Sequence, residues 1–182
     1  SSTDRQPTFE RFAMNKALIV SCALLFSVHT YAAPISPQEK RSAVEDFSLK
    51  DLKGKNHRVS DYKGKVVVVS LWATWCKPCL RELKFLKKLR AAHPDKLEIL
   101  AVATDGPNTA SRIRPVAKRS KLTMPVLLDS DGAVMGALNS RAILPHSTYV
   151  DQKGKVAYSH SGFVAGDDEV ISEVIGALLK EK

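Results

Sequence analysis

Cys76 and Cys79, two cysteines separated by two residues, are the side chains of this sequence whose type and spacing predict chemistry. Such a pair can close a small disulfide and open it again. It follows a buried-strand pattern at 66–72 and precedes an amphipathic segment that starts at Leu80. If a helix begins at or near Cys76, its unpaired N–H groups stabilise the thiolate of that residue. We therefore expect Cys76 to be an exposed nucleophile, largely thiolate near neutral pH, and Cys79, one turn deeper, to be the buried resolving thiol.

The two residues between the cysteines fit this chemistry. Lys77 places a positive charge beside Cys76, and Pro78 restricts the backbone so that both sulfurs stay in bonding range. Half of a structural zinc site is the competing interpretation, but such a site needs a second pair of Cys or His ligands. The chain has three cysteines and five scattered histidines, so no metal site is expected. A purely structural disulfide is also disfavoured because closing so small a loop stabilises little.

The beginning of the chain has the pattern of a secretory signal over residues 14–32. Lys16 precedes an apolar stretch at 17–28, and small residues at 30–32 suit cleavage. The stretch is shorter than the roughly 20 residues of a membrane span, which makes an uncleaved anchor the less favoured alternative. Cys22 resembles a lipoprotein cleavage site, but we favour a chance cysteine. Residues 1–13 are an upstream extension of doubtful status, and 33–182 form one domain.

Charge and composition exclude some classes of function. The formal net charge is +9, and the charged and apolar fractions are ordinary for a globular protein. The Lys and Arg residues lie along predicted helix faces and turns without interleaved aromatic residues. This pattern favours a solvated basic surface over a nucleic-acid interface.

Hydrophobic periodicity predicts an α/β fold with a mixed central sheet, helices on both faces and an N-terminal β-hairpin. Strands are expected at 46–52, 57–59, 66–72, 97–104, 125–128, 147–150 and 155–160. Helices are expected from Leu80 to the His93–Pro94 pair, over 109–120 and over 168–179. Pro115 must kink the second helix or lie in its first turn.

The segments 46–54 and 63–82 resemble the TlpA-like branch of the thioredoxin superfamily, and the resemblance continues through 125–129 and 145–155 to the last helix. It implies a thioredoxin-like fold and a periplasmic thiol–disulfide oxidoreductase. The enzyme would exchange its dithiol with cysteines of other proteins, without metal or organic cofactor. We also expect a thiol electron donor in the membrane, no nucleic-acid partner and a monomeric protein.

The resemblance also assigns roles to residues outside the dithiol. Pro145 lies where the family has a cis-proline loop that faces the dithiol, with Leu144 before the cis bond at the lip of the site. Glu82 matches an active-site glutamate of the related cytochrome-maturation reductases. A buried Glu82 would accept or return the proton of Cys79, and a solvated helix glutamate is the equal alternative. Trp75 and Trp72 are expected to line the site, although Trp72 could equally belong to the core.

Three positions depart from what relatives have. Ser70 stands where cytoplasmic thioredoxins have a buried aspartate, and Lys84 where many relatives have proline. His146, directly after Pro145, could tune the thiolate or contact a partner, but an exposed histidine at a strand edge is favoured.

The direction of the reaction is left open by these patterns. Reduction in cytochrome c maturation or disulfide repair is favoured, and an oxidant or isomerase is the alternative. A non-catalytic binding module is a further alternative, which the presence of both cysteines disfavours. A peroxidase is disfavoured because no Pro-x-x-x-Thr-x-x-Cys pattern occurs.

Overall fold

The structure is a computed structural model that describes residues 33–181. The upstream extension 1–13, the predicted signal 14–32 and Cys22 lie outside this part of the chain. The strands within it are β1 Ser48–Lys50, β2 Asn56–Arg58, β3 Val66–Trp72, β4 Leu97–Ala103, β5 Val126–Leu128, β6 His146–Val150 and β7 Val156–Ser161. The helices are α1 Lys77–Ala92, α2 Ile113–Arg119, α3 Ala133–Leu138 and α4 Asp167–Lys180, with short 3₁₀ turns at Gln38–Lys40, Val59–Tyr62 and Ala110–Arg112. None of these helices has the length and apolar character needed to cross a membrane.

Five strands form the central sheet in the order β5-β4-β3-β6-β7. β3 runs parallel to β4, and β4 to β5, whereas β6 is antiparallel to both β3 and β7. Every residue of β3 and β4 is buried, because helices or the hairpin cover both faces of these inner strands. The mixed sheet predicted from the apolar runs is confirmed.

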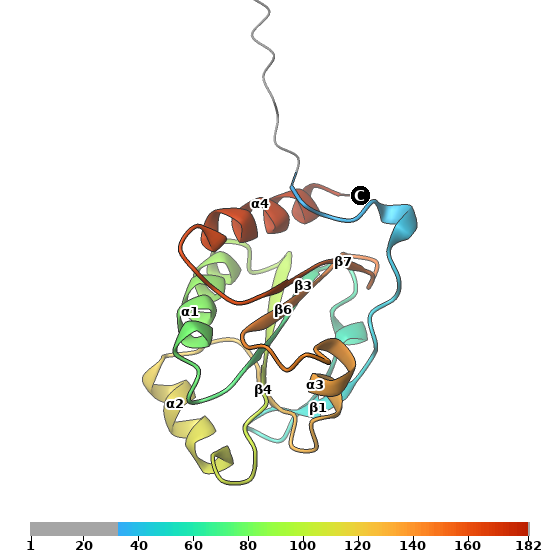
Figure 1. Cartoon of the computed structure of the whole chain (residues 1–182). Helices are drawn as coiled ribbons and strands as arrows, with labels where there is room; N and C mark the ends of the chain where they lie inside the picture. The colour runs from blue at the N-terminus through green and yellow to red at the C-terminus, as the bar shows by residue number, and fades with distance from the viewer. Residues whose placement is uncertain (1–32, 182) are drawn as a thin grey trace, which may run out of the picture. The chain divides into compact units, whose positions relative to one another are not determined.

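Strand connectivity decides which face each helix covers. The crossovers β3–α1–β4 and β4–α2–β5 step across the sheet in the same direction. Because such crossovers are right-handed, both helices lie on one face. α4 joins them there, and the core of this face contains Trp72, Leu83 and Ile171. The other face packs Leu71 against α3 and the N-terminal segments. Figure 1 shows α1 and α2 on one side of the sheet and α3 with β1 on the other.

The predicted N-terminal hairpin is confirmed. β1 pairs antiparallel with β2, and the carboxylate of Asp51 accepts hydrogen bonds from the backbone N–H groups of Lys53 and Lys55 in the turn. Gly54 adopts a φ of +85°, a conformation that glycine reaches without the strain a side chain adds. The residue pair Asp51–Leu127 then bridges the hairpin to β5.

Pro115 lies in the first turn of α2, which is one of its two expected positions, whereas a further helix was not expected. Pro115 is the third residue of α2, in the first turn, where the missing N–H has no intrahelical acceptor to satisfy. The short helix α3 is not predicted by the sequence patterns. The carboxylate of Asp129 accepts hydrogen bonds from the N–H groups of Val134 and Met135 and so stabilises its first turn.

A buried arginine ties the beginning of the domain to its end. The guanidinium of Arg41 donates to Asp151 at 2.9 Å, to both carboxylate oxygens of Glu181 at 2.6 and 2.7 Å, and to the carbonyl of Ser36. The side chain of Asp151 is also buried. This ion pair fixes the N-terminal lead-in against the last residues of the domain.

Candidate active site

The dithiol lies at the junction of β3 and α1, as predicted. Cys76 is the N-cap of α1, and its Sγ accepts a hydrogen bond from the backbone N–H of Cys79 at 3.2 Å. The two sulfurs form a disulfide with an S–S distance of 2.01 Å. Pro78 occupies the second position of the helix, where its missing N–H leaves no hydrogen bond unmade. The sulfur of Cys76 therefore lies at the positive end of the helix dipole.

Exposure of the two cysteines differs from the expectation in one respect. Cys79 is fully buried, as predicted, but Cys76 is only 5% exposed. The prediction that Cys76 is exposed is wrong for this disulfide form, because its sulfur is bonded to that of Cys79 and its side chain belongs to the core cluster between α1 and the sheet. Lys77 and Trp75 are exposed beside it, whereas Trp72 is fully buried in the core.

The Leu144–Pro145 peptide bond is cis, as the family resemblance implied. β6 begins at the next residue, His146, which pairs with Leu71 near the end of β3. The register therefore brings Pro145 to the edge of the sheet from which the chain continues into the dithiol. The carbonyl of Pro145 accepts a hydrogen bond from the N–H of Gly162 at 2.8 Å, and Leu144 is half-buried.

Glu82 is completely buried, which confirms the buried interpretation and excludes the solvated one. The hydroxyl of Ser70 donates to its Oε2 at 3.1 Å, and that of Ser147 to its Oε1 at 2.8 Å. Ser70 and Ser147 face each other in the register of β3 and β6, so one oxygen of the carboxylate meets each strand. Burial raises the pKa of Glu82 to about 7, and the hydrogen bonds from Ser147 and Ser70 oppose this rise.

The helix spacing places Glu82 on the dithiol side of α1. Glu82 follows Cys79 by three residues, a separation that puts two side chains on one face of a helix. Both are fully buried in the layer between α1 and the sheet. A neutral or ionised carboxyl beside the deeper sulfur can give or take one proton near neutral pH.

His146 is buried, so the prediction of an exposed histidine at a strand edge is wrong. β7 covers β6, which makes β6 an inner strand. Because side chains alternate along a strand, His146 points to the face opposite Ser147 and Glu82. Its Nδ1 lies 2.8 Å from the hydroxyl of Ser161, and burial lowers its pKa.

Asp105 belongs to the site, although the motifs did not reveal it. Its buried carboxylate accepts hydrogen bonds from the N–H of Thr74 at 2.9 Å and from the hydroxyl of Thr74 at 2.6 Å. These two bonds fix the loop that leads from β3 to Cys76. An acidic residue two positions after β4, at the carboxyl edge of parallel strands, is the signal that could have found it.

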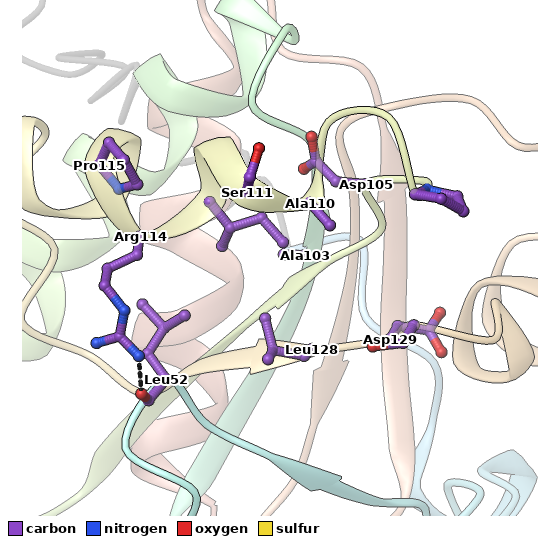
Figure 2. A pocket seen from close by; sticks show the side chains of 12 residues that line it. Leu52, Ala103, Asp105, Ala110, Ser111, Arg114, Pro115, Leu128 and Asp129 are labelled. Atoms are coloured by element: carbon purple, nitrogen blue, oxygen red, sulfur yellow. Dashed lines mark hydrogen bonds between the residues drawn. The ribbon is translucent and has the colours of Figure 1, made fainter.

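A cavity of about 560 Å³ adjoins this loop at the carboxyl ends of β4 and β5. Figure 2 shows Asp105 and Asp129 along its lining and the guanidinium of Arg114 bonded to the carbonyl of Leu52. Apolar residues, among them Ala103 and Leu128, complete the lining.

Comparison with known proteins agrees with this geometry. Residues 41–159 match the AhpC/TSA family. The chain belongs to that family. It is 33% identical over 163 residues to the thiol–disulfide oxidoreductase ResA of Geobacillus kaustophilus, an alignment that covers 87% of this chain and 92% of the relative. The thioredoxin-like protein YneN of Bacillus subtilis is 37% identical over 64% of this chain and 68% of its own length.

Solved structures of similar proteins have the same fold. A Chlorobium tepidum protein assigned as the thiol:disulfide interchange protein DsbE matches with a TM-score of 0.70 and 26% identity, over 76% of this chain and 96% of its own. The exposed lipoprotein thioredoxin Etrx1 of Streptococcus pneumoniae matches with a TM-score of 0.63 and 29% identity, over 73% of this chain and 99% of its own. This member of the AhpC/TSA family has a thioredoxin-like fold and is a thiol–disulfide oxidoreductase.

Proposed function

We propose that this protein reduces disulfides of other proteins in the periplasm, in cytochrome c maturation or disulfide repair. The observation that carries the proposal is the pairing of a disulfide at the N-terminus of α1 with a buried carboxyl one turn further along the same helix. No metal and no organic cofactor takes part, because the Cys76–Cys79 pair itself stores the two electrons. The working form is a monomer.

The first step uses Cys76 as the nucleophile. In the reduced enzyme its thiolate attacks one sulfur of a substrate disulfide, and the substrate S–S bond breaks. The departing substrate sulfur takes up a proton and becomes a thiol. The N–H of Cys79, which already points at the Cys76 sulfur at 3.2 Å, stabilises the negative charge before attack. Exposed Lys77 adds a positive charge next to it.

The second step uses Cys79 and Glu82. The thiol of Cys79 transfers its proton to the ionised Glu82 and attacks the Cys76 sulfur of the mixed disulfide. The Cys76–Cys79 disulfide forms, and the second substrate cysteine leaves as a thiolate that takes up a proton from solvent. A base with a pKa of about 7 suits this transfer, because it is partly ionised at neutral pH and still holds a proton well. Trp75, Leu144 and Pro145 border the approach to the sulfurs.

Recharging the enzyme requires two electrons from a thiol donor in the membrane, because the periplasm is kept oxidising. The location is supported by the signal pattern at 14–32 and by the likeness to an exposed lipoprotein of Streptococcus pneumoniae. We favour removal of the signal over lipidation of Cys22 or an uncleaved anchor.

A thiol oxidant or isomerase is the second candidate, and one observation favours it. The helix N-terminus and Lys77 both stabilise the reduced thiolate, which shifts the pair toward oxidising its partners. The reduction potential decides between the two. A value near about −270 mV, as in thioredoxin, supports the reductase, and one near about −120 mV, as in DsbA, supports the oxidant.

Insulin reduction tests the proposal directly. The wild-type chain should precipitate reduced insulin in the presence of dithiothreitol, and Cys76→Ser should lose this activity. Absence of turnover in the folded wild type would favour a binding module. Cys79→Ser should instead accumulate mixed disulfides at Cys76, and mass spectrometry of these adducts would identify the substrates.

A further inference from the structure

Four basic side chains follow one face of α1 away from the dithiol. Lys77, Arg81, Lys84 and Lys88 are all exposed, and their spacing of four, three and four residues aligns them along the helix. Among residues 33–181, none of the four forms an ion pair. Like charges at this spacing repel one another and weaken the helix. A ligand of opposite charge would relieve that repulsion.

A groove lies beside this row, between α1 and the loop 162–166. Its volume is about 590 Å³, and Arg81, Lys84 and Lys88 form one wall. Its apolar lining includes Phe85 and Phe163, whose ring centroids are 6.4 Å apart, and Val164, which is 68% exposed. Within the described part of the chain, Asp168 is the one acidic residue that lines it.

Both elements that line the groove lead to the redox site: Arg81, in its lining, is one helical turn beyond Lys77. Lys77 follows Cys76 directly in the chain. The loop that forms the other wall begins at Gly162, whose N–H donates to the carbonyl of Pro145. A peptide in the groove can therefore extend along α1 past Lys77 to place a cysteine at Cys76.

We propose that this groove binds an acidic segment of the protein substrate, in which apolar residues alternate with carboxylates, on one side of the cysteine that Cys76 attacks. The proposal rests on the reductase function and names a feature of its substrates. From Lys77 to Lys88 the helix rises about 16 Å, which an extended peptide spans with about five residues. Carboxylates would face the basic row, and the alternate apolar side chains would contact Phe85, Phe163 and Val164.

An anionic membrane is the other partner that a row of basic residues can bind, but the concave shape of the groove argues against it. A bilayer surface meets a convex basic face, whereas this row borders a concave groove with an apolar lining. A peptide can enter the groove and present its cysteine to Cys76 at the same time.

Three disulfide peptides test the inference. They share one intramolecular Cys-Gly-Ser-Cys disulfide and differ in the next five residues, which are Glu-Leu-Glu-Phe-Glu, Gln-Leu-Gln-Phe-Gln or Lys-Leu-Lys-Phe-Lys. A matched set carries the same five residues before the disulfide. The full chain is reduced, freed of reductant and mixed with each peptide, and acid-quenched samples are alkylated to give the second-order rate constant. In each turnover two electrons pass from the Cys76–Cys79 pair to the peptide disulfide, and the two peptide sulfurs take up protons from solvent.

In one of the two sets, the acidic peptide should react about 10-fold faster than the neutral peptide at low salt. The basic peptide of that set should react more slowly than the neutral one. The difference should largely vanish at 1 M NaCl, where the screening length is about 3 Å. Lys84→Glu/Lys88→Glu should reverse the order of acidic and basic peptides. Lys118→Glu/Arg119→Glu, the same charge change on exposed positions of α2, should keep it.

Other outcomes overturn the inference. Equal rates for all peptides refute the groove and leave the reductase function intact. Reversal by both double variants assigns the preference to overall charge. Cosedimentation with phosphatidylglycerol vesicles that only Lys84→Glu/Lys88→Glu abolishes, without any peptide preference, assigns the row to a membrane. Failure to reduce even the neutral peptides refutes the proposed function and the inference with it.

Discussion

Glu82 and Asp151 are both buried carboxylates, yet the chain surrounds them with different partners. Asp151 meets the guanidinium of Arg41 and the backbone N–H groups of Lys153 and Lys155. Burial alone would raise the pKa of Asp151, but these donors outweigh it and the pKa is lowered. Among residues 33–181, Glu82 has two serine hydroxyls as its donors and no ion pair, so burial dominates and its pKa rises to about 7.

This contrast distinguishes a structural carboxylate from one that transfers protons. Asp151 stays ionised throughout the physiological range and holds the two ends of the domain together. Glu82 lies close to half-ionised at neutral pH, beside a sulfur that must lose a proton. The partners of a buried acid, and not burial itself, decide which role it can take.

The largest expected effect is on catalysis. Glu82→Gln removes the base and should slow insulin reduction by about 100-fold or more, the range for loss of a general base. Asp151→Asn should leave the rate within about twofold, because it lies outside the site. Equal loss of activity in the two variants, at a temperature where both are folded, would contradict the assignment of proton transfer to Glu82 and of a structural role to Asp151.

At pH 7 and above, the same Glu82→Gln variant should be more stable than the wild type. Ionisation of Glu82 is unfavourable in the fold, so the free energy of unfolding of the wild type falls as pH rises from 4.5 to about 7. The loss is about 3 kcal/mol at about 1.4 kcal/mol per pH unit, and the variant should not show it. Urea unfolding of the disulfide form at pH 5 and pH 8 measures the difference. A variant with the same pH dependence as the wild type would contradict the raised pKa.

Asp151→Asn should change the free energy of unfolding in the opposite direction, by destabilising the protein. It leaves the buried Arg41 with one carboxylate partner, Glu181, and should lower the free energy of unfolding by about 2 kcal/mol. Because the pKa of Asp151 is lowered, its contribution is present above the unfolded pKa and is lost as pH falls through the folded value. Wild type and variant should therefore converge in acid. A constant gap between their urea midpoints down to pH 2 would argue against the ion pair as the cause.

The smallest effect sharpens the assignment of Glu82. Ser147→Ala removes a hydrogen bond to its carboxylate and should raise the pH midpoint of the resolving step by about one unit, since such bonds contribute about 1.5 kcal/mol. Ser70→Ala, whose hydroxyl lies further from the carboxylate, should shift it less. Rapid-quench kinetics across pH 5–9 measure the midpoint, and Ser147→Thr should restore it. A lower rate with an unmoved midpoint would indicate a purely structural serine.

Local patterns predicted most of the fold and the centre of the site. The apolar run at 66–72, the turn at Gly54 and the dithiol before an amphipathic helix each depend on neighbours in the chain. The cis bond before Pro145 was expected from the family resemblance and is confirmed.

The remaining features depend on contacts between distant segments. Ser147 reaches Glu82 only because β6 pairs with β3 in a register that sets Ser147 opposite Ser70. His146 is buried because β7 covers its strand, which the hairpin prediction alone did not specify. α3 has six residues, too few for a helical period to show, and depends on Asp129 for its first turn. No local pattern contains such information.

The amide that caps the sulfur of Cys76 has a thermodynamic consequence. A disulfide sulfur is a weak acceptor and a thiolate a strong one, so the folded helix terminus favours the form that has gained electrons. Reduction and folding then form one closed cycle. The potential of the folded pair minus that of the unfolded chain, multiplied by 2F, equals the unfolding free energy of the reduced protein minus that of the oxidised protein. Unfolding the reduced and the oxidised protein in parallel therefore measures how far the fold shifts the reduction potential of this pair.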